Sequence, residues 1–446
     1  MTITVLGLSM SSITLGIIGF IVLFVLIMFR LPVALAMASV GFVGFVIIVG
    51  LKPAFSMISY RAYFDFSNYN YGAAIMFILM GYLAYHSGLS EVLYKSFHTM
   101  MGSVRAGLAM ATSITCAAFG AICGSTLATT ASMGVVAIPE MKKYKYDDGL
   151  NTSIVAASGI LGTMIPPSTP LIVYALCTME SVSKLFLATI VPGLLLMIVY
   201  MATAYILSLG KKNRAPGAEK STLLHKIKAV AKGGTIEVVI VFLAVLIGMF
   251  GGLFTPTESG AVGAGCILII TILRRRMTWK KLLAALSDTT KTAAMVFLLV
   301  MGAGIFGSFI SVSRLPAEIT AWCGGLNTSP FIIIMILMLL QLILGCIMDG
   351  MVVLLLTLPI VFPVVTGLGY SSLWLGPLMV LMAGVGMITP PVGVNLYIVN
   401  GIAKDVPLQK TFKTVWWFVL ASMILVAILT AAPDLVTWLP KFLSRR

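Results

Sequence analysis

Two clusters of proline interrupt apolar runs that are long enough to cross a bilayer. The first, TMIPPSTPLIVY, contains Pro166, Pro167 and Pro170, and the second contains Pro390 and Pro391. Proline lacks a backbone donor and clashes with the preceding turn, so each cluster unwinds a helix and frees carbonyl oxygens. In hydrocarbon, free carbonyls are costly unless they are buried or bind something. A simple kink is the alternative for one proline, but two matching clusters favour a binding site at the membrane midplane.

Polar residues that can complete such a site lie in two other apolar segments. CGSTLATT offers the hydroxyls of Ser125, Thr126, Thr129 and Thr130, and CIMDGMVV offers the carboxylate of Asp349. An acidic group near mid-bilayer costs roughly 2.5–3.5 kcal/mol on insertion scales, so it usually has a partner. Oxygen ligands without His or Cys favour a hard cation, and the low charge favours sodium over calcium. The alternative role of the carboxylate is to cap a turn.

The breaks also create helix N-termini, whose partial positive charge favours an anion in the same space. Thr126 lies in one polar centre, Ser168 and Thr169 follow the first break, and Asn395 follows the second. These four side chains are candidates for binding the substrate. Those beside the breaks have an alternative role, which is to bond the backbone groups that the breaks set free.

The elements that position these residues must be membrane helices. The chain has 446 residues, of which 60% are hydrophobic and 10% are charged, and it contains several apolar runs of about 18 residues or more. This composition leaves no room for a large soluble catalytic domain. The net charge of +15 comes from short basic blocks between apolar runs, which indicates positive-inside topology in a lipid bilayer and no nucleic-acid partner.

Hydropathy predicts five full crossings in each half of the chain. They lie near 12–29, 33–50, 72–90, 150–178 and 185–209, and near 236–253, 257–273, 292–312, 372–401 and 414–438. Segments 106–139 and 330–363 have polar or glycine-rich centres, and their arms of about 15–17 residues are short for a crossing at ~1.5 Å per residue. We expect two re-entrant helical hairpins, each entering and leaving on one side.

The two halves are related by an internal duplication. Four landmarks recur 224 residues apart: Pro32 and Pro256, Gly41 and Gly265, Pro139 and Pro363, and Pro166-Pro167 and Pro390-Pro391. Because five crossings is an odd number, the second copy must be inverted. The predicted fold is an all-α polytopic membrane protein with two inverted-topology repeats. Each repeat has about five transmembrane helices, one of them discontinuous, and one re-entrant hairpin.

The predicted boundaries follow from this duplication. The first repeat covers 1–209, with scaffold helices and an arm over 1–105, hairpin 106–139 and broken helix 150–178. A basic linker over 210–234 precedes the second repeat, 235–446, with hairpin 330–363 and broken helix 372–401. The basic linker and the basic loop 274–291 place these segments in the cytoplasm and the N-terminus in the periplasm. Lys441, Arg445 and Arg446 run against the rule at the C-terminal tail.

Two amphipathic connectors, 53–71 and 274–291, join the second and third crossings of each half. The outer connector is rich in Phe and Tyr, and the inner one sets basic residues opposite apolar ones. We expect each to lie flat at the membrane interface as a bracing helix. A solvated loop is the alternative.

Signatures of enzymes are absent or out of context. The sequence has no G-x-S-x-G, H-E-x-x-H or Walker A motif, and its G-x-G-x-x-G match, Gly302 to Gly307, lies inside an apolar span. The six cysteines show no C-x-x-C spacing. An intramembrane enzyme would need a Ser–His or paired-Asp site, which we do not find. We expect no enzymatic activity, no organic cofactor and no ATP-driven transport.

Several motifs resemble a known family. FGAICGSTLATTASMGVVAIPEMKKYKYD and GILGTMIPPSTPLIVYAL resemble the large membrane (M) subunit of tripartite ATP-independent periplasmic (TRAP) transporters, and FTPTESGAVGA, MDGM and GMITPPVGVNLYIVNGIA resemble its second half. The resemblance implies an elevator-type, sodium-coupled symporter in the bacterial inner membrane. Its substrate would be an organic acid, such as a dicarboxylate, a keto acid or sialic acid, delivered by a periplasmic substrate-binding protein. The resemblance also implies a small four-helix membrane subunit, which we expect to be a separate chain.

The resemblance also implies two sodium sites, built mainly from main-chain carbonyls. By position, the first site would contain Ser125, Gly162, Ile165 and Pro167. The second would contain Asp349, Gly386, Thr389 and Pro391. A stand-alone sodium–dicarboxylate symporter of related inverted architecture is the alternative function, and it would need no binding protein.

Overall fold

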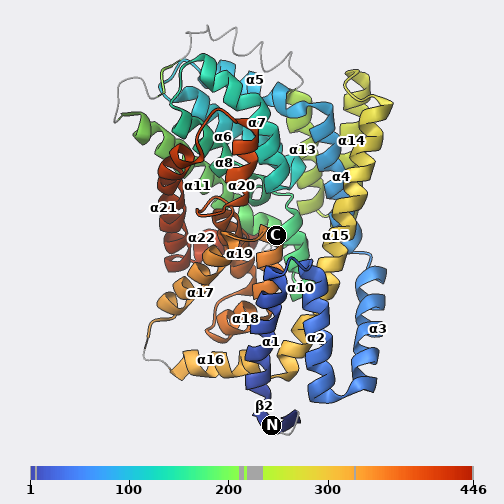
Figure 1. Ribbon diagram of the computed structural model, residues 1–446. Helices are drawn as coiled ribbons and strands as arrows, with labels where there is room; N and C mark the ends of the chain where they lie inside the picture. Colours follow the sequence, from blue (N-terminus) through green and yellow to red (C-terminus); the bar gives the residue numbers. More distant parts are fainter. Residues whose placement is uncertain (1, 6–7, 210–214, 218–234, 326–327, 444–446) are drawn as a thin grey trace.

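The chain folds into a bundle of helices, shown in Figure 1. The computed structural model describes residues 2–5, 8–209, 215–217, 235–325 and 328–443. A short antiparallel strand pair, β1 (Thr2–Val5) and β2 (Leu8–Ser11), precedes the first helix. The all-α polytopic prediction is confirmed by the helices that follow. Most of the predicted linker 210–234 lies outside the described residues.

The first half begins with α1 (Ser12–Met28), α2 (Val33–Val49), α3 (Leu51–Ser67), α4 (Tyr71–Ser87) and α5 (Leu89–Met101). A helical pair follows, α6 (Gly107–Cys123) and α7 (Thr126–Lys143). An interrupted helix comes next, made of α8 (Asp148–Ser158), α9 (Leu161–Met164) and α10 (Thr169–Thr178), and α11 (Val182–Leu209) ends this half.

The second half follows the same order. It contains α13 (Thr235–Phe250), α14 (Pro256–Leu273), α15 (Trp279–Val312), α16 (Leu315–Gly325), the pair α17 (Pro330–Gly345) and α18 (Gly350–Gly367), the interrupted helix α19 (Ser372–Gly386) and α20 (Val394–Ile402), then α21 (Leu408–Ala431) and α22 (Asp434–Leu443). Helices α7 and α18 begin 224 residues apart, and so do α8 and α19. The duplication therefore extends to helix boundaries.

The helices form two groups that lie side by side in Figure 1. In the group we call the scaffold, α2 packs along α15 and α4 packs along α14, with α1, α3 and α13 beside them. The group we call the hairpin group contains α6–α11 and α17–α22, in which α8 packs on α21 and α17 on α19. Helices α5 and α16 lie across opposite ends of the molecule, and α5 bends 69° away from α4 at Gly88.

The expectation of flat helices over 53–71 and 274–291 is wrong. Helix α3 stands upright beside α2 and α15 in Figure 1, and α15 runs without interruption for 34 residues from Trp279. Both connectors bury small or polar residues against neighbouring helices. Asp65 of α3 and Ala285 and Thr289 of α15 are all buried.

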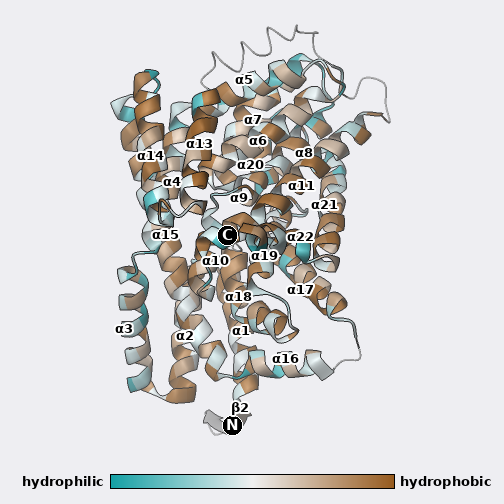
Figure 2. Cartoon of the chain, turned by 180° about the vertical axis from the view of Figure 1, so that it is seen from behind, coloured by the Kyte–Doolittle hydropathy of each residue, from teal (hydrophilic) through white to brown (hydrophobic). Residues whose placement is uncertain are grey.

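Five of the described helices are long and apolar enough to cross a membrane, or up to seven segments if each bent pair counts as one span. Figure 2 shows hydrophobic residues along α11, α13 and α14, as expected for helices that face lipid. Helices α1, α2 and α13, which we predicted as crossings, are shorter, with 16 or 17 residues. One of the five is α18, an arm of the second hairpin, which is therefore long and apolar enough to cross a membrane.

Each hairpin tip is bonded to the interrupted helix of its own half. The first tip is Gly124–Ser125, and Gly124 O accepts a hydrogen bond from Thr169 N at 3.4 Å. The second tip is 346–349, and Cys346 O accepts from Gly393 N at 2.9 Å. Gly124 has φ +62°, and a Cβ there would lie 2.9 Å from Pro167 O. Only glycine fits this left-handed, crowded position without strain.

Behind each tip, the first arm of the hairpin approaches the interrupted helix closely. A Cβ added to Gly120 would lie 2.5 Å from Gly162 Cα, and one added to Gly386 would lie 2.5 Å from Gly345 Cα. In both repeats the hairpin arm therefore touches the break backbone to backbone. The hairpins α6–α7 and α17–α18 come from opposite ends of the molecule, so that their tips meet near its middle (Figure 1).

Candidate functional site

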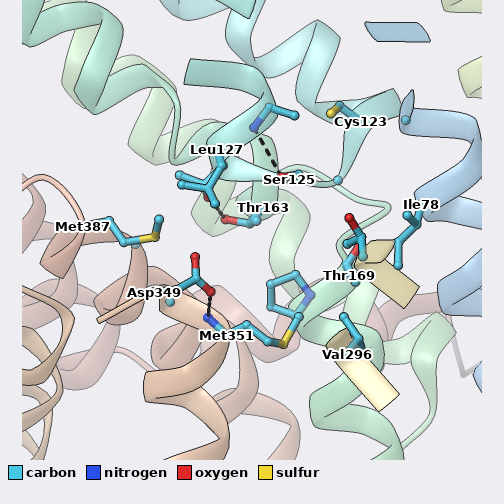
Figure 3. Close-up of a pocket in the computed structure, with 18 of the residues that line it drawn as sticks. Ile78, Cys123, Ser125, Leu127, Thr163, Thr169, Val296, Asp349, Met351 and Met387 are labelled. Atoms are coloured by element: carbon cyan, nitrogen blue, oxygen red, sulfur yellow. Dashed lines mark hydrogen bonds between the residues drawn. The ribbon is translucent and has the colours of Figure 1, made fainter. Parts of the chain in front are cut away.

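A cavity of about 490 Å³ lies where the two hairpin tips meet. Figure 3 shows Ser125 of the first tip, Thr163 and Thr169 of the first interrupted helix, and Asp349 of the second tip around this space. The scaffold closes the other side with residues of α4 and α15. The second interrupted helix also contributes, so residues from six separate segments of the sequence share one cavity.

The first tip holds its hydroxyls in place with local hydrogen bonds. Ser125 is the N-cap of α7, and its side chain accepts from Ala128 N at 3.4 Å. The Thr126 and Thr163 hydroxyls share a hydrogen bond of 2.9 Å, and Thr163 also donates to Ile160 O at 3.1 Å. This wall of the cavity is therefore preorganised, because each hydroxyl already has a partner that fixes its direction.

Asp349 lines the cavity and also caps a helix. One carboxylate oxygen accepts from Met351 N at 2.9 Å, at the N-terminus of α18. Side-chain capping and helix-dipole stabilisation account for a carboxylate at this depth. The capping role is thus observed, and it leaves the other oxygen directed toward the space between the tips in Figure 3.

The other residues expected in the second sodium site lie away from the cavity wall. The second break contributes Ala383, Gly384 and Met387 to the lining, whereas Gly386, Thr389 and Pro391 are not part of it. The Thr389 hydroxyl donates to Val385 O at 2.7 Å, which is a bond within its own helix turn. Asp349 therefore shares the cavity wall with other residues of the second break, but not with these three.

Residues expected in the first sodium site gather behind the first tip. A Cβ on Gly162 would lie 2.7 Å from Ser125 O and 2.4 Å from Thr129 Oγ1. Thr129 Oγ1 is fully buried and has no hydrogen-bond partner among the described residues. Pro167 O lies at the same tip, beside Gly124, whereas the side chain of Ile165 packs toward Gly193 of α11.

Thr129 is a further candidate site residue, which the sequence analysis noticed but did not assign. Its signal was the hydroxyl-rich run CGSTLATT. An unpartnered buried hydroxyl next to a carbonyl and a glycine fits a small oxygen-loving cation. Among the described residues, no group of three or more His, Cys, Asp and Glu side chains is arranged to hold a metal, so a transition-metal centre gains no support there.

The four candidate substrate residues divide into two pairs. Thr126 and Thr169 line the cavity, and Ser168 and Asn395 do not. The Asn395 amide donates to Ala156 O of α8 at 3.2 Å and therefore ties the two interrupted helices together. Asn395 Oδ1 and Ser168 Oγ are buried and have no partner within the described structure.

The scaffold wall carries polar groups that the sequence analysis missed. Tyr82 of α4 and Thr292 of α15 share a 2.8 Å hydrogen bond, and one turn away His86 Nε2 lies 2.8 Å from Asp288 Oδ2. Their sequence signal was weak, because each is an isolated polar residue in a long helix. The pairing depends on two helices 200 residues apart in the chain.

The charges in the cavity are anionic. Asp288 and Asp349 line it, and no Lys or Arg among the described residues does. A cation is attracted to such a space, whereas an anion needs a bound cation or helix N-termini to offset the carboxylates. Thr169 begins α10 and Thr126 begins α7, so two helix N-termini face the cavity.

Comparison with known proteins decides the family. Residues 20–435 match the family described as "Tripartite ATP-independent periplasmic transporter, DctM component". The chain belongs to this family. The resemblance identified from the hairpin and double-proline motifs is confirmed, and a membrane permease subunit, not an enzyme, is the family's role.

Individual members of the DctM family agree with this assignment. The C4-dicarboxylate TRAP transporter large permease protein DctM of Pseudomonas aeruginosa is 31% identical over 378 residues, covering 84% of this chain and 87% of that protein. The isethionate TRAP transporter permease protein DctMQ of Oleidesulfovibrio alaskensis is 32% identical over 420 residues, covering 93% of this chain and 65% of that protein.

The fold also matches a solved transporter. The YdaH transporter of Alcanivorax borkumensis superposes with a TM-score of 0.62 over 85% of this chain and 88% of that one. At 15% identity this likeness concerns the fold alone. It agrees with a polytopic transporter architecture for this DctM-family chain.

Proposed function

We propose that the chain is the permease of a sodium-coupled uptake system for an organic acid. The observation that carries the proposal is the cavity in which Ser125 of one hairpin tip, Asp349 of the other and Thr169 of a broken helix meet. Discontinuous helices that place N-termini and free carbonyls in one central space are typical of ion-coupled secondary transporters.

Sodium coupling is supported by the oxygen groups behind the first tip. We assign the first ion to Ser125, Gly162, Ile165 and Pro167, with the unpartnered hydroxyl of Thr129 as a further ligand. The second ion is assigned to the second tip and break through Asp349, Gly386, Thr389 and Pro391. A bound cation would offset the carboxylates of the cavity and allow an anion to enter.

An elevator-type movement is supported by the division into two groups of helices. The hairpin group carries both tips and both broken helices, whereas the scaffold contributes only one wall of the cavity. Helices α5 and α16 join the groups at opposite ends of the molecule (Figure 1). We propose that the hairpin group carries substrate past the scaffold while these two helices follow it.

An organic acid is the proposed substrate because the names of the relatives specify small anions, a C4-dicarboxylate and isethionate. We propose two partners, a periplasmic substrate-binding protein and a small four-helix membrane subunit. The isethionate relative has about a third of its length outside the match, which is room for such a subunit in fused form. The proposed location is the bacterial inner membrane, with a periplasmic N-terminus and a cytoplasmic 210–234 segment.

The test is uptake into proteoliposomes that contain the chain and its small subunit, with and without the binding protein. We expect uptake of a radiolabelled organic acid only when both a sodium gradient and the binding protein are present. Uptake that ignores a sodium gradient would overturn the coupling. Full uptake without the binding protein would instead support the stand-alone symporter, which the YdaH-like fold keeps as the second candidate.

A further inference from the structure

Arg61 places a cationic side chain in the scaffold, outside the cavity. From α3, its guanidinium donates to Ser308 Oγ of α15 at 3.4 Å. Its stem passes Gly304, where an added Cβ would lie 3.4 Å from Arg61 Cδ. Arginine has five N–H donors, and no described carboxylate forms an ion pair with this one. Most of its donors are therefore available to a ligand.

A buried carboxylate lies one helical turn further along α3. Asp65 is only 4% exposed, and its Oδ2 has no hydrogen-bond partner among the described residues. This oxygen would lie 3.6 Å from a Cβ on Gly304, the same glycine that the Arg61 stem passes. A buried acid without a partner is costly, so its retention beside a guanidinium points to a function beyond packing.

The pair lies at the boundary between the scaffold and the hairpin group. Helix α10 of the hairpin group packs against α15, the helix that Arg61 contacts, and Cys177 near the end of α10 is an electrostatic neighbour of both Arg61 and Asp65. The other end of α10 begins at the cavity, with Thr169 and Pro170 in its lining. Since Cys177 follows Thr169 by eight residues, the two places are about 12 Å apart along this helix.

The opposite end of the scaffold wall has a related arrangement with one difference. Asp288 follows Asp65 by 223 residues, close to the repeat spacing, and it lies on α15, which faces α4. There the carboxylate is bonded directly to His86 at 2.8 Å. At the α3 end no ion pair joins the guanidinium to a carboxylate of the described residues, so its donors remain open to an anion.

We propose that Arg61 binds the carboxylate or sulfonate group of the anionic substrate on the α3 side of the transport path, before the anion reaches the cavity. This inference rests on the proposed function, namely that the cargo is an organic anion. The planar fork of a guanidinium matches such groups in a bidentate way. The cavity wall, in the part of the chain that the structure describes, contains no Lys or Arg. Asp65 weakens the contact by its negative charge, so the anion is released toward the cavity.

The test measures uptake kinetics of the complete transporter in proteoliposomes, with succinate, isethionate, 2-oxoglutarate and sialic acid as probes. For the probes that the wild type takes up, we expect Arg61→Gln to raise KM about tenfold or more, which is the scale of losing one charge-assisted contact. The KM of Arg61→Lys should lie between those of the wild type and Arg61→Gln. Asp65→Asn should lower KM, because it removes the competing charge. Tyr200→Phe is the control, since it breaks the buried hydrogen bond to Ser422 Oγ, outside the cavity, without changing charge.

The expected KM changes have opposite signs in Arg61→Gln and Asp65→Asn, and this difference distinguishes a binding role from a structural one. If Arg61 and Asp65 only hold α3 against α15, both substitutions should lower the melting temperature and leave KM unchanged, and that result would overturn the inference. If Arg61→Gln does not fold, the direction of the KM change in Asp65→Asn and Arg61→Lys decides. A wild type that takes up none of the probes would overturn the proposed function itself, whereas normal wild-type uptake with unchanged KM in the variants overturns only the role of Arg61.

Discussion

Thr126, at the start of the first hairpin's second arm, and Thr163, in the first interrupted helix, share a 2.9 Å hydrogen bond in the wall of the cavity. Both side chains are buried, at 5% and 6% exposed. The bond joins the first hairpin to the first interrupted helix. It therefore fixes the distance between hairpin tip and helix break, on which any site between them depends.

Replacing either threonine with valine removes this bond but keeps the shape. We expect each single variant to lose about 1 kcal/mol of stability, the net value of a typical buried hydrogen bond. The double variant should lose less than the sum, with a coupling of about 0.5–1.5 kcal/mol. The measurement is a double-mutant cycle on thermal unfolding in detergent. Additive losses would contradict a direct bond.

Gly162→Ala tests the first proposed sodium site. The new methyl would lie 2.4 Å from Thr129 Oγ1 and 2.7 Å from Ser125 O, so it occupies the space assigned to the ion. Overpacking of this kind costs about 1–3 kcal/mol. We expect the sodium concentration for half-maximal uptake to rise at least about tenfold, the effect of losing roughly 1.4 kcal/mol of ion binding.

The matched control for this variant is Gly265→Ala in α14, where an added Cβ meets nothing within 4 Å. Its sodium dependence should match the wild type. An unchanged sodium dependence in Gly162→Ala would remove Gly162 from the ion site. A shift of equal size in both variants would mean that the assay reports general damage to the protein.

Asp349→Asn separates the capping role of this residue from its charge. Asparagine still accepts the hydrogen bond from Met351 N, because Asn and Asp are equally good N-caps. We therefore expect normal thermal stability together with weakened sodium stimulation of uptake. Asp349→Ala should also lose the cap, at about 0.5–2 kcal/mol.

Ser371→Ala, which removes the cap of α19, is the comparison for Asp349→Ala. It should cost similar stability and leave the sodium dependence alone. Full sodium stimulation in Asp349→Asn would show that the carboxylate acts only as a cap.

Replacing Pro166 and Pro167 together with alanine should let α9 and α10 join. Alanine permits the helical hydrogen bonds that proline prevents, and it is more favourable than proline in a helix interior by about 3 kcal/mol per residue. The freed carbonyls would then be bonded within the helix, and we expect uptake to be lost while the protein still folds.

Pro139→Ala is the control for the double variant, because this exposed proline lies inside α7 and away from the break. It should transport normally. A fully active Pro166→Ala/Pro167→Ala protein would remove the break from the mechanism.

Much of the fold was readable from patterns that are local in the chain. The apolar runs, the hydroxyl-rich and Asp-containing centres of the hairpins, and the prolines of the breaks each follow from what a bilayer permits in a short stretch of backbone. The 224-residue spacing predicted which segments of the two halves correspond. The helices α8 and α19, which start at Asp148 and Ser372, have this spacing. The flat connectors were wrong because amphipathicity does not say whether the polar face meets water, lipid headgroups or another helix.

By itself, the sequence determined that the chain is a polytopic membrane protein with two broken helices and two polar hairpin tips, because hydrocarbon restricts which backbone can cross it. Only the tertiary structure decided which oxygens stand next to one another. It placed Thr126 and Thr169 in the cavity wall and Ser168 and Asn395 behind it, and it paired His86 with Asp288 across two helices. Such proximities depend on how helices distant in the chain pack, and no periodicity in one segment encodes the position of its neighbour.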